Sequence, residues 1–152
     1  MRLILGVGNS ILGDDAAGLI AAQRLAQIIP KNVADVKEFN GGSIYLFDEL
    51  LDYDEVILID TLAIKGYDEG EVVQLDPLNI QPQVDVSNGH DFPFHMMLEV
   101  YKTTFPERMP KKIRLFGIVT GPQLVFKEGV SEKIERAIDQ VVNLVVDHLE
   151  VN

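Results

Sequence analysis

The sequence contains no cysteine among its 152 residues, which excludes disulfide bonds and thiolate metal ligands. Positive charge is also scarce. The chain has 13 Lys and Arg against 24 Asp and Glu, a formal net charge of −11. A general nucleic-acid-binding protein would carry a basic face, so no nucleic-acid partner is expected.

Long apolar runs are missing as well. No stretch approaches the roughly 20 apolar residues that span a membrane. The apolar start of the chain is interrupted by Gly6, Gly8 and Asn9, a pattern that does not fit a signal peptide. We therefore expect a cytoplasmic protein without a membrane partner. The sequence shows neither a heptad nor an exposed apolar stripe, so a monomer is expected.

The composition, 47% hydrophobic and 24% charged, is typical of a soluble globular protein, and 152 residues suit a single domain, residues 1–152. Apolar patterns alternate between the periods of strands and helices. Strands are predicted at residues 2–7, 33–39, 56–59, 71–75 and 113–119, the fourth of them at a sheet edge where it could run antiparallel. Helices are predicted at residues 15–29, from Ser43 to 51, from His90 or Asp91 to 102, and from Ser131 to 149.

This alternation predicts an α/β fold: a three-layer sandwich whose mostly parallel, twisted sheet of about five strands has helices on both faces. In such sheets, ligands bind outside the carboxyl ends of the strands. Polar residues follow three of the predicted strands there: Asn9, Asp14 and Asp15 after the first, residues 40–43 after the second, and Asp60 with Thr61 after the third.

The loop after the first strand resembles only part of a dinucleotide-binding fingerprint. Gly6 and Gly8 match the Gly-x-Gly-x-x-Gly pattern, but Ile11 stands at its third glycine position. Asp14 and Asp15 at the start of a helix would also repel a phosphate. Either acid could cap the helix, but one cap needs only one acid. A cation is therefore the better ligand for this loop.

Asp60 and the histidines are the other candidate polar groups. Asp60 follows four aliphatic residues, so its carboxylate is either hydrogen-bonded to a neighbouring loop or functional. His148 lies near the carboxyl end of the last helix, where a cation suits the helix dipole, and is interpreted as structural. His90 and His95 would point about 140° apart on one helix, so they should not share a metal. Two carboxylates and one imidazole suit zinc, manganese, iron or nickel.

Residues 5–15, LGVGNSILGDD, resemble the opening signature of the hydrogenase maturation endopeptidases. This family cuts a carboxy-terminal extension from the large subunit of nickel–iron hydrogenases. The resemblance continues at residues 40–43, NGGS, where the family typically has Asp-Gly-Gly-Thr, and at residues 57–60, ILID. A histidine just before a helix in the third quarter of the chain completes it, so that nearly the whole chain is covered in the same order.

The resemblance implies a metal site and a substrate. Two acids and one histidine bind nickel in this family, and by position they correspond to Asp15, Asp60 and His90. The glycine pair Gly41 and Gly42 matches a segment implicated in holding the precursor, and Asn9 and Ser43 are assigned to substrate binding with it. The nickel would be supplied by the large-subunit precursor, the partner protein, and the protease would be metal-free at rest.

Three departures from the family pattern bear on these assignments. Ala16 replaces the glycine that often follows the acid pair, and Asn40 replaces the usual acid before the glycine pair. Pro93 and Phe94 stand where glycine and leucine usually follow the histidine. The last departure leaves His95 as an alternative ligand, although His90 keeps the expected distance to the apolar pattern of the helix.

The resulting hypothesis is a peptidase that removes the carboxy-terminal extension after nickel insertion. Hydrolysis needs an activated water, and either the metal or a carboxylate could activate it. Asp15 is the candidate catalytic base because it lies on a loop rather than at a strand end. Two alternatives stay open at this point: a checkpoint protein that senses nickel loading without cutting, and an unrelated hydrolase with its own tightly bound metal.

Overall fold

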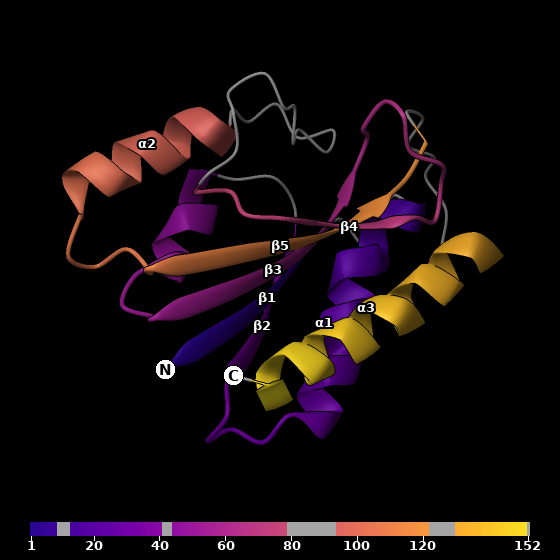
Figure 1. Ribbon diagram of the computed structural model, residues 1–152, viewed down its shortest axis with the longest axis horizontal. Coiled ribbons are helices and arrows are strands. Elements are labelled where there is room, and N and C mark those ends of the chain that lie inside the picture. Colours follow the sequence, from indigo (N-terminus) through magenta and orange to yellow (C-terminus); the bar gives the residue numbers. More distant parts are fainter. Residues whose placement is uncertain (9–12, 41–43, 79–93, 122–129, 152) are drawn as a thin grey trace.

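The computed structural model describes residues 1–8, 13–40, 44–78, 94–121 and 130–151. Five strands form one sheet in the order β2-β1-β3-β5-β4, in which β4 alone runs antiparallel to its neighbour (Figure 1). The strands are β1 (Arg2–Gly8), β2 (Asp35–Asn40), β3 (Glu55–Leu62), β4 (Val72–Leu75) and β5 (Lys112–Val119). The prediction of a mostly parallel sheet with an antiparallel edge strand is confirmed.

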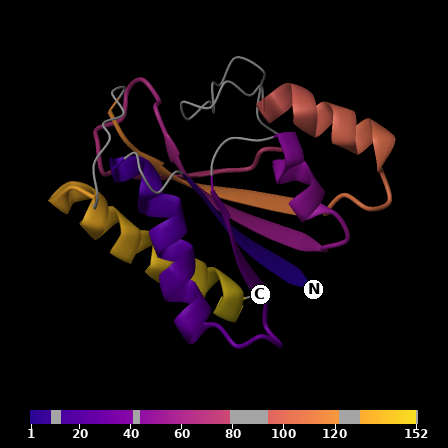
Figure 2. The same cartoon turned by 180° about the vertical axis from the view of Figure 1, so that it is seen from behind.

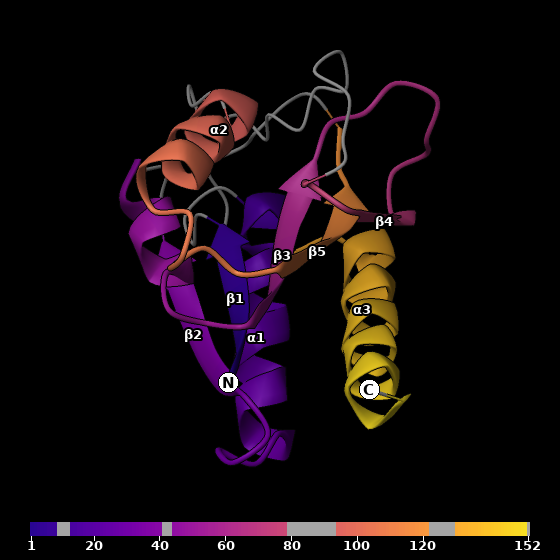
Figure 3. The same cartoon turned by 60° about the vertical axis from the view of Figure 1, so that its left-hand side comes forward.

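Helical segments cover both faces of this sheet. They are η1 (Gly13–Ala16), α1 (Ala17–Ile28), η2 (Ile44–Leu50), α2 (Phe94–Thr104) and α3 (Glu132–Val151), of which η1 and η2 are 3-10 helices. Figure 2 shows α1 and α3 together on one face, and Figure 3 shows α2 on the side opposite α3. The predicted three layers are therefore present. Among the described residues, we find no helix with the length and apolar character needed to span a membrane.

The central strand β3 supplies both halves of the core. Its side chains alternate between the two faces, as in any strand. Ile57 and Ile59 pack with residues of α1 and α3, whereas Val56 and Leu58 pack with residues of η2 and α2. All eight residues of β3 are buried. A continuous apolar run in the sequence thus corresponds to a strand covered on both sides.

Several boundaries differ from the predicted ones. β3 continues two residues beyond Asp60, because it pairs with β5 as far as Leu62 opposite Val119. The predicted helix at residues 43–51 is the 3-10 helix η2, and its expected cap, Ser43, lies outside the described residues. The predicted start of the third helix, at His90 or Asp91, also lies outside them.

Helix α2 is attached to the sheet through η2. The ring of Phe47 lies 5.1 Å from that of Phe94 and 5.3 Å from that of Tyr101, distances typical of aromatic pairs. The Tyr101 hydroxyl donates a hydrogen bond of 2.6 Å to Asp48 Oδ1. This bond, with burial, raises the pKa of Tyr101 to about 12. These contacts fix the position of α2 against η2.

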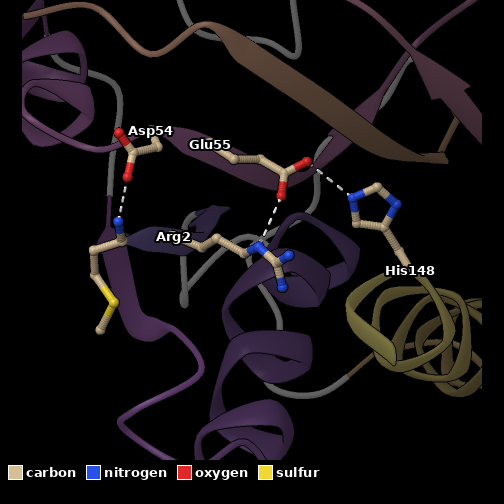
Figure 4. Close-up of polar contacts among 5 residues, drawn as sticks. Arg2, Asp54, Glu55 and His148 are labelled. Carbon is tan, nitrogen blue, oxygen red and sulfur yellow. Dashed lines mark hydrogen bonds and ion pairs between the residues drawn. The ribbon is translucent and has the colours of Figure 1, made fainter. Parts of the chain in front are cut away.

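The amino ends of the strands are held by a cluster around Glu55, which is only 9% exposed (Figure 4). Arg2 Nε lies 3.1 Å from Glu55 Oε1, and His148 Nε2 lies 3.0 Å from Glu55 Oε2. The cluster joins β1, β3 and the last turns of α3. The sequence predicts a structural role for His148 through the helix dipole, and the structure adds this direct contact with a buried carboxylate.

We expect Tyr101→Phe to lower the free energy of unfolding by about 1 kcal/mol at pH 7, because the ring packing stays and only the hydrogen bond to Asp48 is lost. The raised pKa predicts that this contribution is complete below about pH 10, the usual pKa of tyrosine, and declines as the pH rises through 12. Urea denaturation of both proteins at pH 7 and pH 9 measures it. Equal urea midpoints for the two proteins at pH 7 and at pH 9 would contradict the prediction.

Candidate active site at the carboxyl edge of the sheet

Thr61 is the residue at which the two predicted carboxylate ligands meet. Its hydroxyl donates a 2.6 Å hydrogen bond to Asp15 Oδ1, and its backbone N–H donates a 2.8 Å bond to Asp60 Oδ1. Asp15 and Thr61 are almost fully buried, at 0% and 1% exposure, and Asp60 is 8% exposed. Two acids that lie 45 positions apart in the sequence are thus within hydrogen-bond reach of one residue near the carboxyl end of β3.

The close approach of η1 and α1 to the sheet explains how Asp15 reaches β3. A Cβ atom at Gly18 would overlap the carbonyl oxygens of Val7 and Ile59, so α1 lies directly on the backbone of β1 and β3. A Cβ at Gly8 would overlap the carbonyl oxygen of Asp15. The glycines of the opening motif therefore allow the helix start to lie against the strand ends. Their role in the structure is close packing.

The two neighbouring acids have separate partners. Asp14 accepts hydrogen bonds from the backbone N–H of Ser131, at 2.7 Å, and from its hydroxyl, at 3.1 Å. The prediction that Asp14 or Asp15 caps the first helix is wrong, because Ala16 occupies the cap position of α1 without a side-chain cap bond. Tertiary partners take both carboxylates instead. Asp14 ties η1 to the start of α3, which orients the turn that carries Asp15.

The other predicted site residues fall outside the described part of the chain. These are His90, the third candidate ligand, and the candidate substrate-binding residues Asn9, Gly41, Gly42 and Ser43. The alternative ligand His95 lies in the first turn of α2, beside the exposed Met96 and Val100, where the three residues line an open apolar depression. The assignments of His90 and of the precursor-binding residues remain predictions.

Asp15 and Asp60 are the two predicted metal ligands that lie among the described residues. The part of the chain that the structure describes contains no group of three His, Asp or Glu side chains able to hold a metal. Asp15 and Asp60 offer carboxylate oxygens, which divalent first-row metals accept together with imidazole. The sequence places Thr61 beside Asp60 and Ser131 at a helix start but does not predict their partners, because each bonds an acid that is distant in the sequence. A hydroxyl residue directly after a candidate ligand was the only signal of Thr61.

The link between Asp14 and Ser131 can be measured with a double-mutant cycle. We expect Asp14→Ala to lower the free energy of unfolding by about 1–2 kcal/mol and Ser131→Ala by about 0.5–1 kcal/mol, since the first change removes two hydrogen bonds and the second removes one. The double variant should lose about 0.5 kcal/mol less than the sum. Urea denaturation of the four proteins provides these values. Strict additivity would show that the two side chains are not coupled.

A family model and a curated relative match most of the chain. The model, described as hydrogenase maturation protease, matches residues 22–148. This range includes Asp60 and His90, whereas Asp15 and the opening motif precede it. The hydrogenase 2 maturation protease of Escherichia coli strain K12 is 25% identical over 146 residues, which cover 92% of this chain and 87% of that protein.

Solved structures with the same fold include two that carry related names. The hydrogenase maturating endopeptidase HybD from Escherichia coli superposes with a TM-score of 0.78 at 24% identity, covering 98% of this chain and 91% of the other. The [NiFe] hydrogenase maturation protease HycI from Thermococcus kodakarensis KOD1 gives 0.75 at 23% identity, covering 98% and 92%. Together with the family model that spans most of its length, these findings show that the chain belongs to the hydrogenase maturation protease family.

Proposed function

We propose that this peptidase removes the carboxy-terminal extension of the large-subunit precursor of a nickel–iron hydrogenase after nickel has been inserted. Asp15, Asp60 and His90 would bind the nickel ion that the precursor carries. The nickel is thus part of the substrate, and the protease needs no metal of its own. The coarser statement, a protease of hydrogenase maturation, follows from the family; the nickel-dependent recognition is our proposal.

The contacts of Thr61 carry the proposal. A hydroxyl and a backbone N–H of one buried residue bond the two carboxylates that the family resemblance assigns to nickel. Asp15 comes from the turn before α1 and Asp60 from the end of β3, and this carboxyl edge is where open α/β sheets bind ligands. The geometry therefore supports a shared role for the two acids, which an isolated cap or a solvated surface acid would not require.

Binding of the precursor's nickel would fix the scissile peptide bond relative to the protease. This is catalysis by proximity, since it replaces a random encounter with one fixed orientation. In the hydrolysis step, the oxygen of a water molecule bonds to the peptide carbonyl carbon, the carbon–nitrogen bond breaks, and a proton passes to the leaving amine. Asp15 is our candidate to accept the proton of that water, because it is placed on a turn rather than within a strand.

The first test is the mass of a purified large-subunit precursor, with and without nickel, after incubation with this protein. We expect the extension to be lost only from the nickel-loaded precursor, because the apo precursor offers nothing for the three ligands to bind. Intact-mass spectrometry detects the released peptide. A stable complex without any cleavage would overturn the proposal and favour a checkpoint that senses nickel loading. Cleavage of both forms would overturn nickel-dependent recognition.

The two histidines on either side of Pro93 provide a matched pair of variants. We expect His90→Ala to lower cleavage of the nickel-loaded precursor at least about 100-fold, since losing a ligand should cost more than losing a group that only orients one. His95→Ala should stay within about 3-fold of the unmodified protein. The initial rate of peptide release measures both variants. The reverse result would move the ligand assignment to His95.

Asp15→Asn separates the two roles proposed for Asp15. Asparagine keeps a side-chain oxygen that can accept the Thr61 hydrogen bond, but it is a much weaker base than a carboxylate. If Asp15 is the base as well as a ligand, cleavage should fall at least about 100-fold, and by a clearly larger factor than the affinity for nickel-loaded precursor. Single-turnover rates and a binding titration measure the two quantities. An equal loss in both would assign Asp15 to nickel binding alone.

A further inference from the structure

Thr61 occupies an unusual position on the central strand. Its side chain is 1% exposed, although most threonines lie at the surface. By strand alternation it continues the series of Ile57 and Ile59, which pack against α1 and α3. An apolar residue would satisfy that environment as well. A hydroxyl here needs a hydrogen-bond partner, and its partner is the carboxylate of Asp15.

The two bonds of Thr61 run to different faces of β3. Alternation places the side chain of Asp60 on the face opposite that of Thr61. The carboxylate of Asp60 nevertheless lies against the backbone N–H of Thr61, at 2.8 Å, while the hydroxyl on the other face bonds Asp15. Thr61 thus lies between the two acids and contacts both. A change in its side chain affects the bond to Asp15 and leaves the backbone bond to Asp60 in place.

We infer that the Thr61 hydroxyl is a positioning group, which orients the Asp15 carboxylate for binding the nickel ion of the proposed site. Bonds of this kind fix the orientation of a metal ligand, and their loss typically lowers metal affinity 10–100-fold. The short 2.6 Å distance is typical of a hydroxyl donating to a charged oxygen. The inference rests on the proposed function, because it assigns Thr61 a role in the same nickel site.

The test uses two substitutions at position 61. One removes the hydroxyl of threonine, and the other removes its methyl group. Thr61→Val keeps the branched shape and replaces the hydroxyl with a methyl group, which removes the donor to Asp15. Thr61→Ser keeps the donor and removes a methyl group. We expect Thr61→Val to weaken binding of Ni²⁺ about 10-fold or more, and to lower cleavage of nickel-loaded precursor by a similar factor. Thr61→Ser should stay within about 3-fold on both measures.

Isothermal titration with NiCl₂ gives the affinity, and peptide release from the precursor gives the rate. A purely structural role would predict that serine and valine change melting temperature without this split in nickel affinity. If Thr61→Val does not fold, Thr61→Ala takes its place, because alanine and serine at position 61 differ only by the hydroxyl. Thermal melting, monitored by circular dichroism, shows whether the Thr61→Val variant is folded.

The outcomes separate the inference from the proposed function. Nickel affinity of Thr61→Val equal to that of the unmodified protein would overturn the role of Thr61, even if cleavage depends on nickel. If the unmodified protein binds Ni²⁺ but leaves nickel-loaded precursor uncut, the proposed cleavage fails, and the valine and serine affinities still decide the role of Thr61. An unmodified protein that neither binds Ni²⁺ nor cuts the precursor would overturn both.

Discussion

Helix α1 lies in direct contact with the backbone of the sheet, and the position of the candidate site depends on that contact. Gly18 is the point of contact, because any side chain there would overlap carbonyl oxygens of both β1 and β3. The neighbouring helix positions that face the sheet are also small, namely Ala17, Ala21 and Ala22, all buried. A helix with larger residues at these positions would lie farther from β3. The turn before the helix would then carry Asp15 away from Thr61.

Much of the fold could be predicted from the sequence, because hydrophobic periodicity reports how each segment is buried. The continuous apolar run at residues 56–59 correctly indicates a central strand, and residues 71–75 correctly indicate an edge strand. The rule that ligands bind at the carboxyl ends of parallel strands indicates three polar segments, and two of them contain Asp15 and Asp60. The structure places both beside Thr61. Patterns of this kind are local or depend only on strand direction, so a single sequence is sufficient to read them.

The interpretation of the acid pair could not be completed in the same way. Capping rules consider a side chain and the helix that follows it, and they favour Asp14 or Asp15 as the cap. In the structure both acids instead bond hydroxyl residues far away in the sequence, 117 residues for Asp14 and 46 for Asp15. No residue near positions 14 and 15 in the sequence indicates that Ser131 and Thr61 are the partners. The same holds for Thr61, whose importance depends on which element packs against its face of β3.

The bond between Asp14 and Ser131 also has a consequence for how this protein could change in evolution. Ser131 stands at the start of α3, far from the opening motif in sequence, yet its N–H and hydroxyl both bond the acid that precedes Asp15. Loss of either side chain alone leaves a polar group without its partner. Residues 14 and 131 should therefore tend to be replaced as a pair among related sequences. Substitutions at the start of the first helix and at the start of the last helix are thus expected to be correlated at these two positions.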